Sequence, residues 1–563
     1  MNVGERLTQL LQEYGVEVVF GVPGGQTLAL YEGIRNSQGK IRHVLVRDER
    51  SAVYAADAYS RITGKTGVCD ATVGPGATNL PSGIAEAYAS SIPLVAIIAD
   101  IPRGWEHRRN RGSASQGMNQ LEMFSKIAKW TGVVNTPEAI DDVVDACFRI
   151  AHTGRPGPTI LCIPDDVFNS QVDEGSFKKR ANRRPFHPWH RSCADDSDVR
   201  KAAEALLRSA KPAIFAGGGV HLSKAYEPLK ELAELLKAPV ATTITGKGSI
   251  EETHPLALGV AGSMGRREVN ETLREADAVL VVGNKLGQVA SLQWELPSPQ
   301  AKLIHLDIDG AEIDRNIASD IALVGDAAAT LKALVNHCKQ LMGDSAFKNE
   351  WGDHGEATSW KKAGPEHPDE NPAHPADIIR ILRDFTKPDD VVVCDASLSS
   401  GWAAVHWVVR ESGRRFIAPR GLAGLGYGAP AAIGAALGRA DGKRVICLAG
   451  DGGWAYSMQE VETMARLGLP VLVIVLNNRT LGWVKHVQKT RFKEKYISTD
   501  FAEVDYAKAA EAMGARAYRA RNARRFEECL NNLGELSGPA FIEVSVNEFD
   551  TPVLRNNSSA GEF

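Results

Sequence analysis

Short apolar runs alternate with amphipathic, alanine-rich stretches in the first and last thirds of the chain. The first third contains VEVVFGV, HVLVRD, VCDATV and PLVAIIA, and the last third contains DVVVCDA, KRVICLAGD, LPVLVIVLN and AFIEVSV. Apolar strands separated by helices are typical of parallel sheets that are covered on both faces. The pattern therefore predicts an α/β protein built from doubly wound parallel sheets.

The middle third repeats this alternation with AIFAGGGV, PVATTI, ADAVLVVGN and KLIHLDID. Two segments rich in proline, histidine and charge, roughly 171–198 and 352–377, interrupt the rhythm as linkers do. We therefore predict three α/β domains of ordinary size and a short polar tail. Their expected ranges are 1–170, 190–345, 375–548 and, for the tail, 549–563.

Composition excludes several classes of protein. The chain has 563 residues, a formal net charge of −4 and 44% hydrophobic residues, which allows several cores and gives no sign of a nucleic-acid surface. The longest apolar runs are strand-sized, and the N-terminus has acidic residues and no long apolar core, so we expect neither a membrane span nor a secretory signal. Eight cysteines without CxxC spacing indicate reduced thiols in a cytoplasmic protein.

Two glycine- and amide-containing segments carry the clearest chemical signal. Asp451 lies in GDGGW, and Asn478 follows it by 27 residues in LNNRT. Glycines in a tight turn present backbone N–H groups to a diphosphate, and a carboxylate, a carboxamide and a carbonyl oxygen suit Mg²⁺. The intervening residues predict a helix, a turn and a buried strand, which brings two loops to one sheet edge. The bland alternative is a buried Asp and a strand-end Asn in an ordinary sheet.

This arrangement resembles the GDG…NN motif of thiamine-diphosphate (ThDP) enzymes. The resemblance implies that Mg²⁺ is bound by Asp451, Asn478 and a backbone oxygen of Thr480, with Gly450, Gly452 and Gly453 in the diphosphate turn. It covers almost the whole chain in the order pyrimidine-binding domain, middle domain and diphosphate-binding domain. In such enzymes the first and last domains meet across a subunit interface, so it also implies a homodimer or homotetramer.

A glutamate in the first domain matches the family's activating acid. Glu49 begins VRDERSAVYAADAYSRITGK, and the resemblance implies that it bonds N1′ of the aminopyrimidine. Without the resemblance, it is equally a solvated residue that complements a helix dipole. Further implied residues are Gly25 facing the thiazole, Pro75 in the glycine-rich loop GPGATN, and the active-site glutamine Gln116. That loop, taken alone, is also consistent with a plain turn.

The last domain holds two more matching segments. In PRGLAGLGYGAPAAIGAA, the resemblance implies that Ala423 supplies a backbone acceptor for the 4′-amino group. It also implies that Leu425 props the cofactor into its bent shape, although a core leucine is the alternative. In CDASLSS, Ser397 and Ser399 are candidate donors on the diphosphate side.

Among ThDP enzymes the chain most resembles the acetohydroxyacid synthases and their paralogues, the 2-hydroxyacyl-CoA lyases. It departs from the synthases where Asp48 replaces His, Gly117 replaces Glu, and Trp483 and Val487 replace Met and Trp. These last two changes reshape the expected substrate pocket by an aromatic ring at each site.

The segment after the second motif is the expected substrate side. His486 and Glu494 are candidates for proton transfer at the cleaved bond, against the alternative of a solvated helix face. The middle domain contains GGG and LDID, which suggest a nucleotide-type crevice, although the match to GxGxxG is poor. The family resemblance implies that this domain holds FAD or ADP or stays empty.

Three functions remain open from the sequence. The first is a ThDP- and Mg²⁺-dependent C–C bond lyase or carboligase acting on a short 2-oxo acid or related 2-hydroxy carbonyl substrate through a ylide and an enamine. The second is a 2-hydroxyacyl-CoA lyase that takes a CoA thioester and releases formyl-CoA. The third is a non-catalytic nucleotide-binding subunit.

Overall fold

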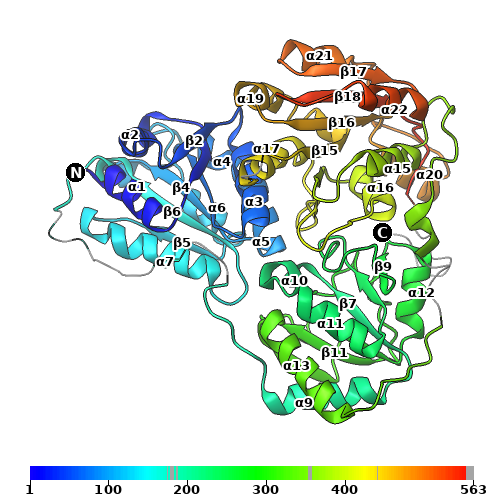
Figure 1. The fold of residues 1–563 in the computed structure, drawn as a ribbon. Coiled ribbons are helices and arrows are strands. Elements are labelled where there is room, and N and C mark those ends of the chain that lie inside the picture. The colour runs from blue at the N-terminus through cyan, green and yellow to red at the C-terminus, as the bar shows by residue number, and fades with distance from the viewer. Residues whose placement is uncertain are drawn as a thin grey trace.

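Three parallel sheets, each covered by helices, make up the protein in the computed structural model (Figure 1). The structure describes residues 1–173, 175, 177, 183–184, 188–352, 358–439 and 442–552. Most of the expected tail 549–563 and parts of both expected linkers lie outside the described residues. The α/β class and the three doubly wound parallel sheets predicted from the sequence are confirmed.

The first sheet has the strand order β2-β1-β3-β4-β6-β5. Each position of β4 and β6 is buried, which explains why these strands are continuous apolar runs. The elements are α1 (Val3–Glu13), β1 (Val18–Gly21), η1 (Gly25–Thr27), α2 (Leu28–Asn36), β2 (Arg42–Leu45), α3 (Glu49–Thr63), β3 (Gly67–Ala71), α4 (Pro75–Asn79), α5 (Pro81–Ser90), β4 (Leu94–Asp100), η2 (Arg103–Arg108), α6 (Gln120–Phe124), β5 (Trp130–Val133), η3 (Pro137–Ala139), α7 (Ile140–His152), β6 (Pro158–Pro164) and α8 (Asp165–Phe168).

The second sheet has the order β12-β11-β10-β7-β8-β9 and lies below the other two in the view of Figure 1. Asp326 caps its last long helix by accepting a hydrogen bond from the N–H of Ala329. The elements are α9 (Asp196–Arg208), β7 (Pro212–Ala216), α10 (Gly218–Ser223), α11 (Tyr226–Leu236), β8 (Val240–Thr242), β9 (Ala257–Val260), α12 (Arg267–Glu275), β10 (Ala278–Val282), β11 (Lys302–Asp307), β12 (Ile321–Val324), α13 (Ala327–Met342) and, in the connection that follows, η5 (Ser359–Lys362).

The third sheet, β14-β13-β15-β16-β18-β17, repeats the strand order of the first. Both are therefore the same winding of the chain, used twice. The elements are α15 (Pro375–Phe385), β13 (Val391–Cys394), α16 (Leu398–His406), β14 (Phe416–Ile417), α17 (Gly428–Gly438), β15 (Val445–Gly450), α18 (Asp451–Trp454), α19 (Glu460–Arg466), β16 (Val471–Asn477), α20 (Gly482–Arg491), α21 (Tyr506–Ala512), β17 (Arg516–Ala520), α22 (Ala523–Asn531) and β18 (Ala540–Ser545).

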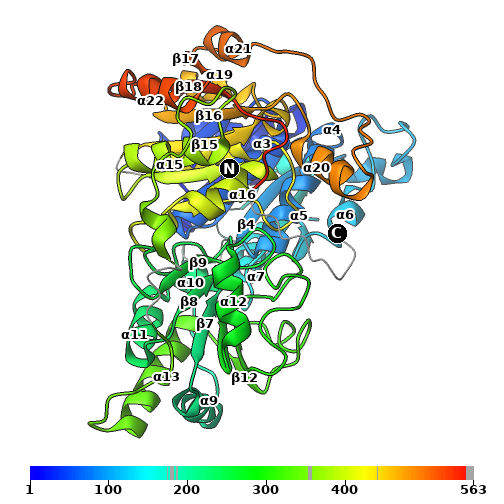
Figure 2. The ribbon, with the colours of Figure 1, turned by 90° about the vertical axis from the view of Figure 1, so that its right-hand side faces the viewer.

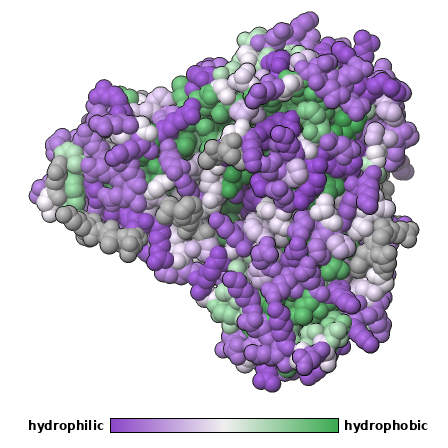
Figure 3. All heavy atoms as spheres, viewed as in Figure 1, coloured by the Kyte–Doolittle hydropathy of each residue, from purple (hydrophilic) through white to green (hydrophobic). Residues whose placement is uncertain are grey.

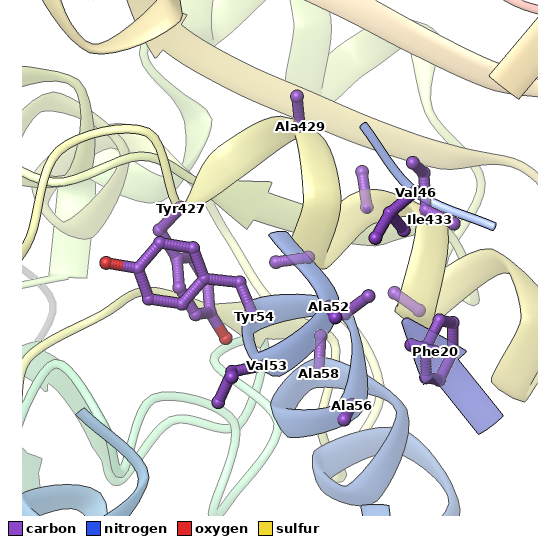
Figure 4. Packing of buried hydrophobic residues seen from close by; sticks show 14 of the residues in the cluster. Phe20, Val46, Ala52, Val53, Tyr54, Ala56, Ala58, Tyr427, Ala429 and Ile433 are labelled. Atoms are coloured by element: carbon purple, nitrogen blue, oxygen red, sulfur yellow. The ribbon is translucent and has the colours of Figure 1, made fainter. Parts of the chain in front are cut away.

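The first and third domains pack against each other through α3 and α17 (Figures 2 and 4). Small residues allow the close approach, because a Cβ at Gly434 of α17 would overlap the carbonyl of Ala55 in α3. The rings of Tyr54 and Tyr427 meet edge to face 5.1 Å apart at one end of this contact. One buried cluster therefore runs through both domains.

Within the described residues, no helix is both long enough and apolar enough to cross a membrane. The face shown in Figure 3 is mostly polar, with apolar side chains gathered near the junction of the first and third domains.

Candidate active site

A cavity of about 440 Å³ opens at the carboxyl ends of β13, β15 and β16. Loops that follow parallel strands meet at this edge, so segments distant in sequence converge there. All ten residues that the sequence predicted for cofactor or metal binding in the last domain line the cavity: Ser397, Ser399, Ala423, Leu425, Gly450, Asp451, Gly452, Gly453, Asn478 and Thr480.

Asp451 begins α18 directly after β15 and is almost fully buried. Burial raises the pKa of its carboxyl group to about 6, although backbone N–H groups of Asn478 and Gly452 favour the charged form. No side chain in the described part of the chain pairs with it. A buried carboxylate without a cation is the environment that a bound metal ion would complete.

The two neighbouring asparagines at the end of β16 have different surroundings. Asn477 points into the domain, where its Nδ2 donates to Glu543 Oε1 over 2.8 Å. Asn478 lines the cavity, and its Oδ1 accepts a hydrogen bond from the N–H of Thr480 over 3.3 Å. The tight turn therefore presents the carboxamide of Asn478 and the backbone of Thr480 on the same side as Asp451.

This oxygen set fits Mg²⁺ better than a transition metal, because it combines one carboxylate with an amide and a backbone carbonyl. No group of three or more His, Cys, Asp or Glu side chains suited to a metal ion occurs among the described residues. A metal ion bound here would take further oxygens from a diphosphate or from water.

Asp395, which the sequence analysis did not single out, organises the other wall of the cavity. It follows β13 and is fully enclosed, and its carboxylate accepts hydrogen bonds from the N–H groups of Gly426 (3.1 Å) and Gly428 (2.8 Å). Burial raises its pKa to about 6 against these donors. A Cβ at Gly453 would press against this carboxylate, so the glycine turn and the loop before α17 are fixed to one side chain.

Glu86 of α5 fixes the same loop from the first domain and was also missed. Its carboxylate accepts hydrogen bonds from three successive N–H groups, at Gly421 (3.0 Å), Leu422 (2.7 Å) and Ala423 (3.1 Å). Burial opposes its charge, but Arg61 and these donors outweigh burial and lower its pKa. Ala423 has φ of 61°, a strained value for alanine, and this clamp holds it there. An Ala-rich helix gives no sequence signal for such a residue.

The predicted residues of the first domain form a second group at the edge of the first sheet. Glu49 begins α3 after β2, and its Oε2 accepts a hydrogen bond from Asn79 Nδ2 over 2.9 Å. Pro75 begins α4, the short helix that ends at Asn79. The backbone of Gln116, with φ of 62°, lies against Gly74. Gly25 follows β1 and begins η1.

The structure brings these two groups to the edges of two sheets and not into one cavity. Glu49, Gly25, Pro75 and Gln116 are not among the residues that line the cavity of the third domain. In a single chain, therefore, each group is half of the arrangement that the sequence predicted.

Comparison with known proteins decides the family. The chain matches the models of the thiamine pyrophosphate enzyme N-terminal TPP binding domain at residues 1–123, the central domain at 199–334 and the C-terminal TPP binding domain at 395–544. The chain belongs to the thiamine pyrophosphate enzymes.

Its relatives place it in one branch of the family. It is 32% identical to the "Probable acetolactate synthase large subunit" of Methanococcus aeolicus, over 97% of this chain and 92% of the relative. It is 31% identical to the "Acetolactate synthase isozyme 2 large subunit" of Escherichia coli K12, over 100% of this chain and 99% of the relative. The chain is therefore a thiamine pyrophosphate enzyme of the acetolactate synthase-like branch, as the motifs predicted.

The substrate-side residues of this thiamine pyrophosphate enzyme are spread along α20 and the turn after it. Trp483 lines the cavity, whereas Val487 and His486 on the same helix do not. Glu494 lies exposed in the turn after α20 with φ of 62°. Of the residues predicted here, the structure brings only the aromatic ring of Trp483 to the cofactor cavity.

A second cavity, of about 370 Å³, lies between the first and middle domains. Gly218 and Gly219 at the start of α10 line it, as does Asp307 at the end of β11. Burial raises the pKa of Asp307 to about 6. Asp309 instead turns its backbone N–H to Asp307 Oδ1 and is not among the lining residues. The GGG and LDID segments thus meet at one crevice.

Proposed function

We propose that this protein is a ThDP- and Mg²⁺-dependent carboligase or lyase acting on a short 2-oxo acid or a related 2-hydroxy carbonyl compound. The observation that carries the proposal is the buried carboxylate of Asp451, which has no side-chain partner among the described residues and lies beside Asn478 in the same cavity as Ala423 and Leu425. The names of the relatives, which are acetolactate synthases, support the carboligase assignment.

Bound ThDP would supply the carbanion equivalent and the electron sink for making or breaking a bond beside a carbonyl group. Asp451, Asn478 and Thr480 would hold Mg²⁺ with the diphosphate, and the glycine turn would accept the phosphate oxygens at backbone N–H groups. The strained backbone of Ala423 would accept a hydrogen bond from the aminopyrimidine. Glu49 would hold the proton at N1′ of that ring.

We propose that the first-domain group of one chain completes the cavity of a second chain, so that the enzyme is at least a homodimer. Both half-sites carry apolar side chains that stay exposed in one chain: Leu28 beside Gly25 is 57% exposed, and Leu422 beside Ala423 is 53% exposed. Burial of such residues is a driving force for association. A dimer of dimers is the expected larger assembly.

The crevice of the middle domain supports binding of a nucleotide, FAD or ADP. Gly218 and Gly219 leave room for a phosphate near the backbone, and Asp307 suits a ribose hydroxyl. Purified protein that carries the visible absorption of a flavin would identify FAD. A rise in melting temperature with ADP alone would identify ADP.

Calorimetry with ThDP and Mg²⁺ tests the main proposal. We expect wild-type protein to bind ThDP only when Mg²⁺ is present. Asp451→Asn should lose at least the roughly 10- to 100-fold in affinity that is typical when even a supporting group of a metal site is removed. Absence of ThDP binding to the wild type would instead support a non-catalytic nucleotide-binding subunit.

A donor screen separates the two catalytic candidates. Release of CO₂ from pyruvate supports the carboligase acting on 2-oxo acids, whereas release of formyl-CoA from a 2-hydroxyacyl-CoA supports the lyase.

We place the reaction in the cytoplasm, because all eight cysteines are free thiols and seven of them are buried.

A further inference from the structure

Arg420 is a positively charged side chain in the wall between the two cavities. It lines the thiamine cavity together with Ala423 and Leu425, and it also lines the crevice of the middle domain. Among the described residues that line the thiamine cavity, it is the only lysine or arginine. Arg420 would therefore be the described cation that pairs with an anion bound in that cavity.

No described residue accepts a hydrogen bond from the guanidinium of Arg420 or forms an ion pair with it. The residue is half-buried, and burial of the guanidinium lowers its pKa, although a guanidinium keeps its proton in proteins. An arginine carries five N–H donors, and leaving them unpaired in a desolvated place is costly. The two cavities that Arg420 lines are the directions from which an acceptor can come.

The nearest acid, Glu86, is already occupied. Its two oxygens accept hydrogen bonds from the N–H groups of Gly421, Leu422 and Ala423, and Arg61 and Ser90 bind it as well. Glu86 therefore stabilises the charge of Arg420 through space while fixing the backbone that follows it. This arrangement positions the guanidinium and leaves its donors free for a ligand.

The position of Arg420 in the loop favours the reacting end of the cofactor over the diphosphate end. It precedes Ala423 by three residues and Leu425 by five, and these two residues are the ones that would hold the pyrimidine and the thiazolium. Asp451 and Asn478, at the diphosphate end, instead follow β15 and β16 directly. An anion at Arg420 would thus lie beside the carbon that reacts.

Resting on the proposed function, we propose that Arg420 binds the carboxylate of a 2-oxo acid substrate and selects such acids over neutral carbonyl compounds. Planar, bidentate pairing with a carboxylate is the contact that arginine makes best. The pairing suits an acceptor acid, whose carboxylate is retained in the product, because the contact then persists from substrate to product.

Binding of oxamate and oxamide to the ThDP- and Mg²⁺-loaded protein tests this proposal by calorimetry. Oxamate is an unreactive anion shaped like a short 2-oxo acid, and oxamide replaces its carboxylate with a neutral amide. We expect Arg420→Gln to weaken oxamate binding roughly 10- to 100-fold, the loss expected for hydrogen bonds to a charged group, and to leave oxamide binding within about twofold. Arg420→Lys keeps the charge and should keep part of the affinity.

Arg521→Gln is the matched control. Arg521 is exposed and lines neither the thiamine cavity nor the crevice of the middle domain. We expect this variant to bind oxamate as the wild type does. The carboxylate site is overturned if Arg420→Gln binds oxamate normally, if Arg521→Gln loses binding equally, or if loaded wild type does not bind oxamate.

The same titrations separate this inference from the proposed function. ThDP binding that survives in Arg420→Gln, with oxamate binding lost, supports both. If ThDP binds but the affinity for oxamate does not depend on Arg420, the carboxylate site alone is overturned. Absence of ThDP binding to the wild type overturns both. A melting temperature for Arg420→Gln close to that of the wild type ensures that the comparison concerns folded protein.

Discussion

Single residues with unusual surroundings define the candidate site more clearly than the motifs do. Asp395 and Glu86 each gather backbone N–H groups from the loop before α17, and Asp451 stays buried without a side-chain partner. Burying a charge is costly unless hydrogen bonds or an opposite charge compensate it. The loop supplies hydrogen bonds to Asp395 and Glu86, and a metal ion would supply the opposite charge for Asp451. Hydrogen bonds to backbone N–H groups thus hold the protein part of the site together.

The test at this scale is Glu49→Gln. The amide cannot hold a transferable proton at the pyrimidine, so we expect turnover to fall at least about 100-fold while ThDP binding stays measurable. Steady-state kinetics and calorimetry on the same preparation check both parts. Glu138→Gln, an exposed change in the same domain, serves as control. Near-normal turnover in Glu49→Gln would remove Glu49 from the proposed chemistry.

At the scale of elements, α3 and α17 join the first and third domains through small residues. Figure 4 shows α3 and α17 side by side, with Ala52 on α3 and the rings of Tyr54 and Tyr427 together at one end. The contact matters for function because α3 begins at Glu49 and α17 follows the loop that carries Ala423 and Leu425.

Gly434→Ala tests that packing. The added methyl group would overlap the backbone of Ala55, and overpacking of a tight core typically costs about 1–3 kcal/mol. Urea denaturation should show this loss. Gly104→Ala adds the same atom where nothing lies within 4 Å and should change stability by less than about 0.5 kcal/mol. Equal effects of the two changes would contradict the close approach of the helices.

The end of α16 brings a pH dependence. Burial, together with Arg380 and Arg266, lowers the pKa of His406 to about 3, so this residue is neutral in the folded protein. The contribution of neutral His406 to the free energy of unfolding is complete above the pKa of about 6.5 that a histidine has in the unfolded chain. This contribution is lost as pH falls towards 3. His406→Phe keeps a ring against Trp402 and removes the titration.

We therefore expect the free energy of unfolding of the wild type to fall by about 2 kcal/mol more than that of His406→Phe between pH 7 and pH 5. Urea denaturation at the two pH values measures this difference. His107→Phe, at an exposed position, should behave like the wild type. Identical pH slopes for wild type and His406→Phe would show that His406 is not buried in its neutral form.

At the scale of the whole molecule, we expect the catalytic arrangement to need two chains. The first and third sheets share one winding, yet Glu49 lies apart from the residues that line the cavity around Asp451. Association of two chains would bring each half-site to its complement and cover Leu28 and Leu422.

Mixing two inactive variants tests this arrangement. Glu49→Gln and Asp451→Asn, refolded together in equal amounts, would give mixed dimers in which one of two sites is intact. Random pairing then predicts recovery of about a quarter of the wild-type activity. A mixture no more active than either variant alone would show that both halves belong to one chain.

The sequence determined the three α/β domains and the cofactor motifs, because both are local. Apolar periodicity follows from strands buried on both faces, and GDGGW with LNNRT encodes a turn chemistry that needs few neighbours. For the same reason Gly450 to Gly453, Asn478 and Thr480 were predictable, and they meet in one cavity.

Only the tertiary structure decided what depends on distant partners. Glu86 and Asp395 are ordinary acids in sequence, and their meaning comes from N–H groups that the fold delivers from other segments. The place of Arg420 between two cavities is likewise a result of packing. Desolvating a charged side chain costs free energy only when the surrounding domains close around it.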